Sequence, residues 1–281
     1  MTKTEEPSNA SAKDGLLSDL DHGVLTITID RPEAGNSLDE HTRLSMVGAL
    51  RRADADLSVR AVVLTASGDK AFCSGADLRV ASASFPRPEG APESVQGDMA
   101  RLVATGWQVL FTSLMDCEKP VIAAVNGIAA GGGMQLVLAC DLVFMASSAR
   151  LVPAFIRRGL VPDAGGAYMA THLIGPQRAK QVYMLGDDIS ADEAVRLGLA
   201  NFAVPQEDLG ATAQKYARRL ADGPTRALAM TKRLINHALD VDRHAALSEE
   251  ALSQEMVRAT SDAEEGIQSF LERRPPRFRG Y

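Results

Sequence analysis

Residues 121–139 read VIAAVNGIAAGGGMQLVLA, and this stretch decides how the rest of the chain is interpreted. Its apolar start, residues 121–125, predicts a short buried strand, and residues 134–139 predict a buried helix. Three consecutive glycines, Gly131 to Gly133, lie between them. Glycines at such a turn allow close approach to the backbone, and the first N–H groups of the helix lack helical partners. Together with the helix dipole, these donors predict a site for an anionic group.

The glycine triplet has three interpretations, one purely structural and two that imply a ligand. In the first, the glycines only make a tight turn that lets the helix pack closely on the strand. A phosphate-binding loop is disfavoured, because no Lys-Ser or Lys-Thr pair follows and the next helix is almost wholly apolar. A dinucleotide-binding motif is also disfavoured, because the G-x-G-x-x-G spacing is absent and other strands come first. The remaining sequence has to decide among them.

Composition limits the class of protein and its partners. The chain has 281 residues, of which 46% are hydrophobic and 23% charged, as expected for one large globular domain or one and a half. A net charge of -6 gives no indication of nucleic acid or an anionic membrane as a partner. The three cysteines are scattered without a C-x-x-C motif, which is typical of reduced thiols. With neither a secretory signal nor a run of about 18 apolar residues, we expect a cytoplasmic protein.

Hydrophobic periodicity predicts an α/β body followed by a helical end. Strands are expected at residues 24–30, 61–65, 121–125 and 141–146, with helices between them. One of these helices follows a capping box from Ser37 to Glu40. After residue 205 only amphipathic helices are expected, at residues 206–221, 224–238, 242–259 and 262–273, the last with a capping box from Ser261 to Glu264. The predicted organisation is a disordered tail over 1–17, a core over 18–205 and a helical region over 206–281.

One long segment interrupts this pattern. Residues 81–97 are rich in Ser, Pro, Ala and Gly and show neither helical nor strand periodicity. A long loop inside a compact domain is either disordered or a lid over a site. The sequence leaves both alternatives open.

Four motifs in order give the chain a family resemblance. They are AFCSGADL at 71–78, the stretch 120–141 that contains the glycine triplet, PDAGG at 162–166, and EGIQSFLERRPP at 265–276. At this spacing, over residues 20 to 280, the chain resembles the crotonase (enoyl-CoA hydratase/isomerase) superfamily, and is closer to its isomerase-type members than to the two-glutamate hydratases. The resemblance implies an α/β fold with a spiral core of ββα turns and a C-terminal helical trimerisation region.

The resemblance also implies a substrate and a reaction type. Members bind acyl-CoA thioesters, need no cofactor besides the coenzyme A of the substrate, and assemble as homotrimers or dimers of trimers. Two backbone N–H groups, which map here to Ser74 and Gly132, hold the thioester oxygen while an enolate forms. Such preorganised donors typically stabilise a developing oxyanion by about 3 kcal/mol each.

Further substrate contacts follow from the same resemblance. The segment from Ser74 through Gly75 and Ala76 to Asp77 is expected to line the pantetheine and acyl path, and Ala34 the coenzyme A. Gln135 and Phe155 are expected to face the acyl group. Near the C-terminus, Arg274 and Phe278 are expected to contact coenzyme A, including that of a neighbouring subunit.

The chain departs from the hydratases at both catalytic positions. Similar hydratases carry one glutamate two places after the glycine triplet, where this chain has Gln135. The second glutamate maps to Phe155, or to Ala154 by an alternative count. Hydration requires a base for water and an acid for the α-carbon. Neither an amide nor an apolar side chain supplies these, so ordinary hydratase activity is not expected.

Asp163 is the remaining acidic candidate. It lies in PDAGG, where several isomerases of the family carry their catalytic carboxylate, and its apolar neighbours favour a raised pKa. The competing interpretation is a turn-forming aspartate that caps the next helix. Arg157 and Arg158 have two interpretations as well, partners of a polar acyl group or a solvated surface. No His, Cys and Asp pattern has metal-ligand spacing.

These observations predict an acyl-CoA enzyme that shifts a double bond through an enolate. Ser74 and Gly132 would hold the oxyanion, and Asp163 would carry the proton. One alternative is an enoyl-CoA hydratase with atypical residues, or another enolate reaction. A second alternative is a non-catalytic acyl-CoA binding protein that keeps the pocket without the acids.

Overall fold

The structure is a computed structural model that describes residues 15–77, 88–92 and 95–281. Within these residues the strands form two sheets. The larger sheet has the order β1-β2-β3-β5-β7-β10, and the smaller has the order β4-β6-β8-β9. Only β1–β2 and β8–β9 pair antiparallel, and every other pairing is parallel. Parallel strands are normally covered on both faces, which agrees with the fully buried β5.

From β3 to β8, successive strands alternate between the two sheets. The larger sheet holds β1 (Leu16–Asp21), β2 (Val24–Ile29), β3 (Ala61–Ala66), β5 (Val121–Val125), β7 (Leu142–Ala146) and β10 (Phe202–Val204). The smaller sheet holds β4 (Ala71–Cys73), β6 (Ile128–Ala130), β8 (Arg150–Val152) and β9 (Ile189–Ser190). The pairs β3–β4, β5–β6 and β7–β8 each supply one strand to each sheet. This repeat is the spiral of ββα turns that the family resemblance implies.

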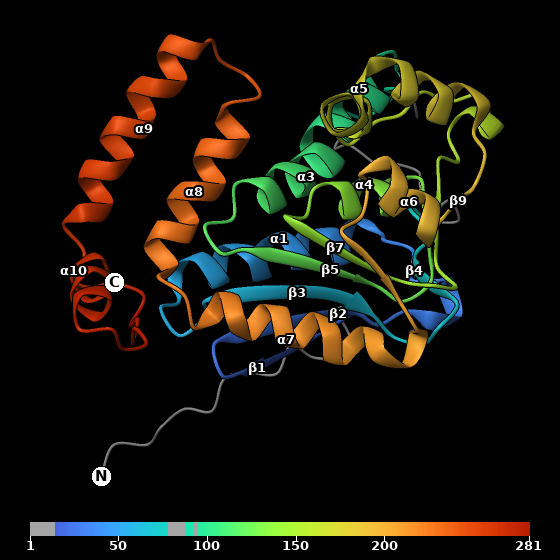
Figure 1. Cartoon of the computed structure of the whole chain (residues 1–281). Helices are drawn as coiled ribbons and strands as arrows, with labels where there is room; N and C mark the ends of the chain where they lie inside the picture. The colour runs from blue at the N-terminus through green and yellow to red at the C-terminus, as the bar shows by residue number, and fades with distance from the viewer. Residues whose placement is uncertain (1–14, 78–87, 93–94) are drawn as a thin grey trace.

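Helices cover both faces of the larger sheet. Figure 1 shows α7 (Leu209–Ala221) along one face, with α1 (Glu40–Ala55) and α3 (Gln108–Met115) on the other. The path into α3 runs through α2 (Asp98–Leu102) and a π-helical segment, Val103–Trp107. The remaining elements of the core are α4 (Gly132–Leu138), α5 (Gly166–Leu185), α6 (Ala191–Leu197) and short 3-10 turns at Pro32–Ala34, Ile156–Arg158 and Gln206–Asp208.

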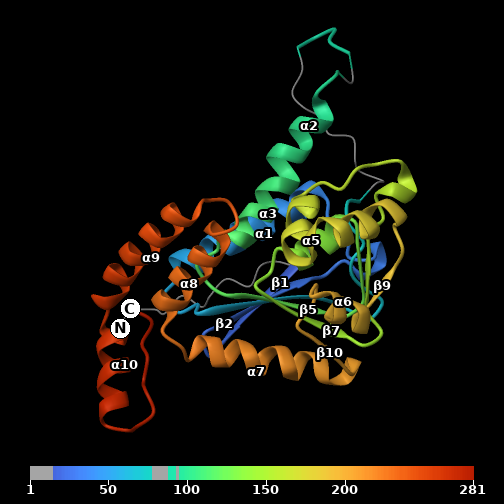
Figure 2. The same cartoon turned by 45° about the horizontal axis from the view of Figure 1, so that its top comes forward.

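The C-terminal helices stand to one side of this core. They are α8 (Thr225–His237), α9 (Arg243–Arg258) and α10 (Ser261–Leu271), and Figures 1 and 2 show α9 and α10 away from the sheets. The tail after α10 turns back, where Asp262 accepts hydrogen bonds from the backbone of Arg279 and Gly280. The predicted helical end is therefore confirmed in the described residues, with boundaries within three residues of those expected.

Two predicted helix caps are wrong. The first residue of α1 is Glu40, and its N-cap is Asp39, whose carboxylate accepts from the Thr42 N–H at 2.8 Å, so Ser37 lies outside the helix. The N-cap of α10 is Thr260 and not Ser261. In both places a neighbouring Asp or Thr competes for the same role, because all these side chains accept from the N2 or N3 amide.

Several short strands were not predicted. β4, β6, β8, β9 and β10 have only two or three residues each, too few for their periodicity to be distinctive. The strand β1 has six residues, but it is largely exposed and its sequence LLSDLD does not alternate. Because β1 begins at Leu16, the core begins two residues earlier than the predicted boundary at residue 18. The predicted tail up to residue 14, and the larger part of the predicted loop at 81–97, lie outside the described residues. In the part of the chain that is described, no helix is both long and apolar enough to cross a membrane.

Candidate active site

The glycine triplet occupies the turn from β6 into α4, as the sequence predicts. A Cβ atom on Gly133 would lie 2.1 Å from the carbonyl oxygen of Cys73, and one on Gly132 would lie 2.5 Å from the Trp107 ring. These glycines are therefore required by close packing on β4 and on the π-helical segment. Because α4 has only seven residues, its dipole adds little, and individual N–H groups matter more.

The loop after β4 packs directly against this turn. A Cβ atom on Gly75 would lie 2.9 Å from the Ala130 oxygen and 3.3 Å from the backbone nitrogen of Gly132. The structure therefore brings together the two motifs that were expected to form one site. The neighbouring turn at Ala34 also lies here, since Gly35 accepts a hydrogen bond from the loop.

The hydrogen bonds of this loop correct the choice of donor. The Ser74 N–H donates to the Gly35 oxygen at 3.1 Å, so it is already used within the protein. Leu38 forms a parallel bridge with Ala76, in which it bonds to the Gly75 oxygen and to the Asp77 N–H. The N–H of Ala76 points away from Leu38 in such a bridge, and it has no acceptor among the described residues. Ala76, and not Ser74, is therefore the available donor beside Gly132.

Asp77 anchors the loop after β4 through an ion pair with Arg31. Its side chain is 3% exposed and its carboxylate lies 3.3 Å from the Arg31 guanidinium, which also pairs with Asp39 at 3.1 Å. A carboxylate that is buried and paired in this way positions a backbone segment and is poorly placed to line the substrate path. The predicted substrate contact at Asp77 is therefore not supported for its side chain.

Gln135 lies deep in the site and is held by one side chain. Its Oε1 accepts a hydrogen bond of 2.9 Å from the Tyr183 hydroxyl, which the sequence did not identify. Its Nε2 has no hydrogen-bond partner among the described residues, although Gln135 is only 1% exposed. An unpaired buried donor costs about 1–3 kcal/mol, so such atoms require an explanation.

A bend in α5 makes this contact possible. Gly166 also lies against Gln135, since a Cβ atom there would be 2.4 Å from the amide group. In a straight helix Gly166 and Tyr183 would be about 25 Å apart. The helix is interrupted at Gly175, with φ 75° and ψ 160°, just before Pro176, and Figure 1 shows its two arms at an angle. Both arms therefore reach the same side chain.

Asp163 lies three residues before the start of α5 and is half-buried. No side chain caps α5, whose N-cap residue is Gly165, so the interpretation of Asp163 as a helix cap is wrong. Burial raises the pKa of the Asp163 carboxyl above its ordinary value, while a hydrogen bond from its own backbone N–H acts in the opposite direction. The carboxylate lies near enough to Tyr183 for its charge to act there. Burial above all raises the pKa of Tyr183 to about 12, and the negative charge of Asp163 acts in the same direction.

Three buried aromatic rings surround these groups. Trp107 packs on Gly132, Phe111 packs on Gly165, and the Phe155 ring lies 4.0 Å from the Cβ position of Gly131. At Gly132 and Gly165 a larger residue would leave no room for the ring. Phe155 therefore lies beside the glycine turn, and presents an apolar edge at the position that maps to the second glutamate of the hydratases.

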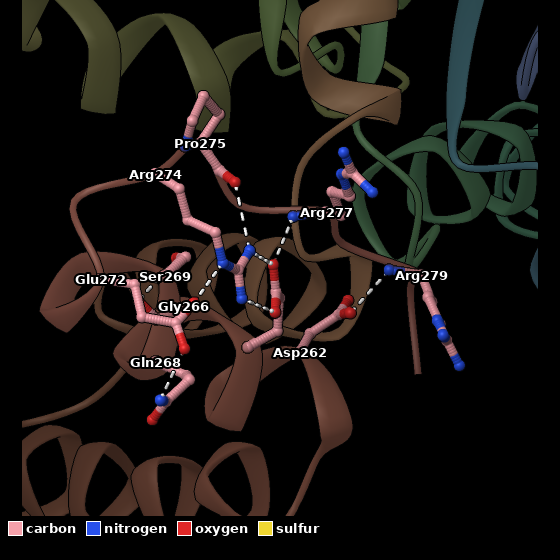
Figure 3. A network of polar contacts seen from close by, with 10 residues as sticks. Asp262, Gly266, Gln268, Ser269, Glu272, Arg274, Pro275, Arg277 and Arg279 are labelled. Atoms are coloured by element: carbon pink, nitrogen blue, oxygen red, sulfur yellow. Dashed lines mark hydrogen bonds and ion pairs between the residues drawn. The ribbon is translucent and has the colours of Figure 1, made fainter.

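The other charged candidates are engaged elsewhere. Arg157 pairs with Asp188 at 2.6 Å, and Arg158 donates to the Ala154 oxygen. The Arg274 guanidinium donates hydrogen bonds to both carboxylate oxygens of Glu265 and to Glu272, the second of which Figure 3 shows. Its predicted contact with coenzyme A is therefore not supported. Within the described residues no group of three His, Cys, Asp or Glu side chains is placed to hold a metal ion.

The chain is similar to known proteins over nearly its whole length. Residues 19–281 match the family model for enoyl-CoA hydratase/isomerase. The chain is 39% identical to a probable enoyl-CoA hydratase of Rhodobacter capsulatus, over 93% of this chain and 96% of that protein. It is 36% identical to the 1,2-epoxyphenylacetyl-CoA isomerase of Escherichia coli, over 94% and 98%. The crystal structure of an enoyl-CoA hydratase from Bacillus anthracis superposes with a TM-score of 0.86 at 33% identity, covering 95% of this chain and all of that one.

Proposed function

Because the chain belongs to the enoyl-CoA hydratase/isomerase family, we propose that this acyl-CoA enzyme moves the double bond of an enoyl-CoA thioester. One observation carries the proposal. The half-buried Asp163 carboxylate is accompanied by Gln135 and Phe155 at the two positions where the family's hydratases carry acids. A single carboxylate suffices to move one proton, whereas hydration needs an acid and a base together.

The oxyanion is held by backbone donors. In this proposal the N–H groups of Ala76 and Gly132 both bind the thioester oxygen. The support is the packing of Gly75 against Gly132 and the absence of another acceptor for Ala76 among the described residues. As negative charge builds on the oxygen, these fixed donors stabilise it without reorganising.

Asp163 carries the proton between two carbons. Its carboxylate removes a proton from C2 of a 3-enoyl thioester, and the C–H electron pair enters the dienolate. The C3–C4 double bond then takes the proton at C4, which leaves a double bond between C2 and C3. No atom is gained or lost, so the step needs no cofactor besides the coenzyme A of the substrate. The raised pKa of Asp163 makes its carboxylate a stronger base for taking up the proton.

The substrate path is proposed from the positions of the motifs. The backbone of Ser74, Gly75 and Ala76 would border the thioester, and the turn at Ala34 would lie along coenzyme A. Gln135 and Phe155 would face the acyl group, together with Trp107 and Phe111. The Escherichia coli relative acts, by its name, on an acyl group that bears an epoxide.

A hydratase is the second candidate, and one observation favours it. The Rhodobacter capsulatus relative, at 39% identity, is named a probable enoyl-CoA hydratase. Mass spectrometry of products from 2-enoyl and 3-enoyl thioesters separates the two, because isomerisation leaves the mass unchanged and hydration adds one water. We expect isomerisation of the 3-enoyl substrates. A product heavier by one water would favour the hydratase, and tight binding without turnover would favour a non-catalytic binding protein.

We also propose that the chain assembles as a homotrimer or a dimer of trimers through its C-terminal helices. The support is a set of exposed apolar side chains on α9 and α10, which are Leu247, Leu252, Met256, Phe270 and Leu271. Figure 1 shows these helices apart from the sheets. Large apolar surfaces of this kind mark sites of association in soluble proteins.

A further inference from the structure

Only one of the two polar groups of the Gln135 amide has a hydrogen-bond partner among the described residues. Its oxygen accepts from Tyr183 at 2.9 Å, and its nitrogen lacks an acceptor in the part of the chain that the structure describes. A methionine would fill nearly the same volume without any unpaired donor. Packing alone therefore does not account for an amide here, and still less for a tyrosine hydroxyl that fixes its orientation.

The Gln135 amide lies between the start of α4 and the first residue of α5. Gln135 follows Gly132 by three residues on α4, and helical side chains lean back toward the N-terminus of their helix. Its amide therefore lies toward the end of α4 that carries the Gly132 N–H. The Gly166 backbone closes its other side, and a hydrogen bond of 2.8 Å from the Gly166 N–H to the Asp163 oxygen joins that backbone to the turn of Asp163.

Tyr183 determines which amide group faces the site. It is buried, and its hydroxyl proton is given to the Gln135 oxygen, so the NH₂ group is the one left to bind a ligand. A buried donor of this kind discriminates strongly, because a ligand without an acceptor leaves it unpaired. An oxygen atom on the acyl chain is the acceptor that an acyl-CoA site would meet.

We propose that Gln135, oriented by Tyr183, donates a hydrogen bond to an oxygen carried by the acyl chain beyond the thioester, so that the enzyme prefers oxygenated acyl-CoA substrates over plain alkyl ones. Gln135 is then a specificity-determining residue and Tyr183 a positioning residue. The inference rests on the acyl-CoA site of the proposed function, but it does not require isomerisation.

The test is a binding measurement with matched ligands. Dissociation constants are measured by calorimetry for hexanoyl-CoA, 3-hydroxyhexanoyl-CoA and 4-hydroxyhexanoyl-CoA, each recovered unchanged as checked by mass spectrometry. We expect at least one hydroxyacyl-CoA to bind about tenfold or more tightly than hexanoyl-CoA. Gln135→Met should reduce this ratio to about twofold or less, and Tyr183→Phe, which keeps the ring, should reduce it several-fold.

Matched controls separate this role from a general loss of structure. Gln214→Met and Tyr168→Phe remove the same groups from hydrogen bonds with Thr26 and Asp240 elsewhere, and should keep the wild-type ratio. Equal affinities for all three ligands in the wild type would overturn the inference, as would a preference that persists in both site variants. If the enzyme shows this binding preference but does not isomerise 3-enoyl thioesters, the inference about Gln135 stands and the proposed function is refuted.

Discussion

Tyr183 donates a hydrogen bond of 2.9 Å to Gln135 from the second arm of a helix whose first residue packs on the same amide. Seventeen residues separate Gly166 from Tyr183, and only the bend at Gly175 brings both to one side chain. The site is thus closed on one side by a single bent helix. The turn that contains Asp163 leads into the start of the same helix, where Gly166 packs on the Gln135 amide.

Straightening or straining this bend should damage the site. Gly175→Ala places a side chain at φ 75° and ψ 160°, a region that is essentially restricted to glycine, at a cost of about 1–3 kcal/mol. We expect a lower melting temperature and loss of the preference for hydroxyacyl-CoA. Gly198→Ala is the control, since Gly198 also has a positive φ but ends α6 outside the site. It should lower the melting temperature while keeping the preference, and equal loss in both variants would contradict the role of the bend.

The packing of Gly75 against the glycine turn should be as sensitive to substitution as the bend in α5. Gly75→Ala adds a methyl group 2.9 Å from the Ala130 oxygen and 3.3 Å from the Gly132 nitrogen, so the loop that carries Ala76 must move. Because oxyanion donors act only when positioned, we expect kcat/KM to fall by about 10²-fold or more. Steady-state kinetics on a 3-enoyl-CoA measures this. Near-normal kcat/KM would exclude this loop from the oxyanion site.

The pH dependence of stability should report the setting of Asp163. Burial raises its pKa in the folded protein above the ordinary value of 3.8. A raised carboxyl pKa means that folding favours the protonated form. The resulting contribution to the free energy of unfolding is therefore complete below the pKa of the unfolded state, and it is lost as the pH rises through the pKa of the folded state. Urea unfolding from pH 4 upward should therefore show Asp163→Asn gaining stability relative to the wild type. A constant difference across that range would indicate an ordinary pKa.

Assembly should depend on the exposed apolar side chains of α9 and α10. Replacing Met256 and Phe270 together by Glu places charges where these side chains, 61% and 81% exposed in the isolated chain, would be buried between subunits. Light scattering after gel filtration should find the wild type at three or six times the chain mass and the double variant at the chain mass. Leu57→Glu, an exposed apolar position on the core, should leave the mass unchanged. A monomeric wild type would refute the proposed assembly.

Much of the fold could be predicted because its signals are local. The strands β2, β3, β5 and β7, the glycine turn and the C-terminal helices depend on periodicity and on residue type, and the structure confirms them. The strands of two or three residues carry too little pattern to identify, and the exposed strand β1 lacks alternation. The N-caps at Asp39 and Thr260 were missed because adjacent residues have the same capping chemistry.

The site was predicted less completely because its contacts are long-range. The motifs at 71–78 and 131–135 identified two neighbouring backbone segments, but only the bridge between Leu38 and Ala76 shows which N–H is available. Tyr183 lies 48 residues after Gln135, and no local pattern relates them. A glycine beside a proline, at Gly175 and Pro176, was the one signal in the sequence that a bend would occur there.

The most direct test of the proposed function is the rate at which wild type, Asp163→Asn and Asp163→Ala convert a 3-enoyl-CoA to the conjugated 2-enoyl-CoA, followed by absorbance and product mass. Asp19→Asn, an exposed aspartate on β1, is the matched control. With Asp163 as the proton carrier, both Asp163 variants should lose about 10²-fold or more in kcat, while the control stays within about twofold of the wild type. Unchanged turnover in both Asp163 variants would contradict the mechanism and remove Asp163 from it.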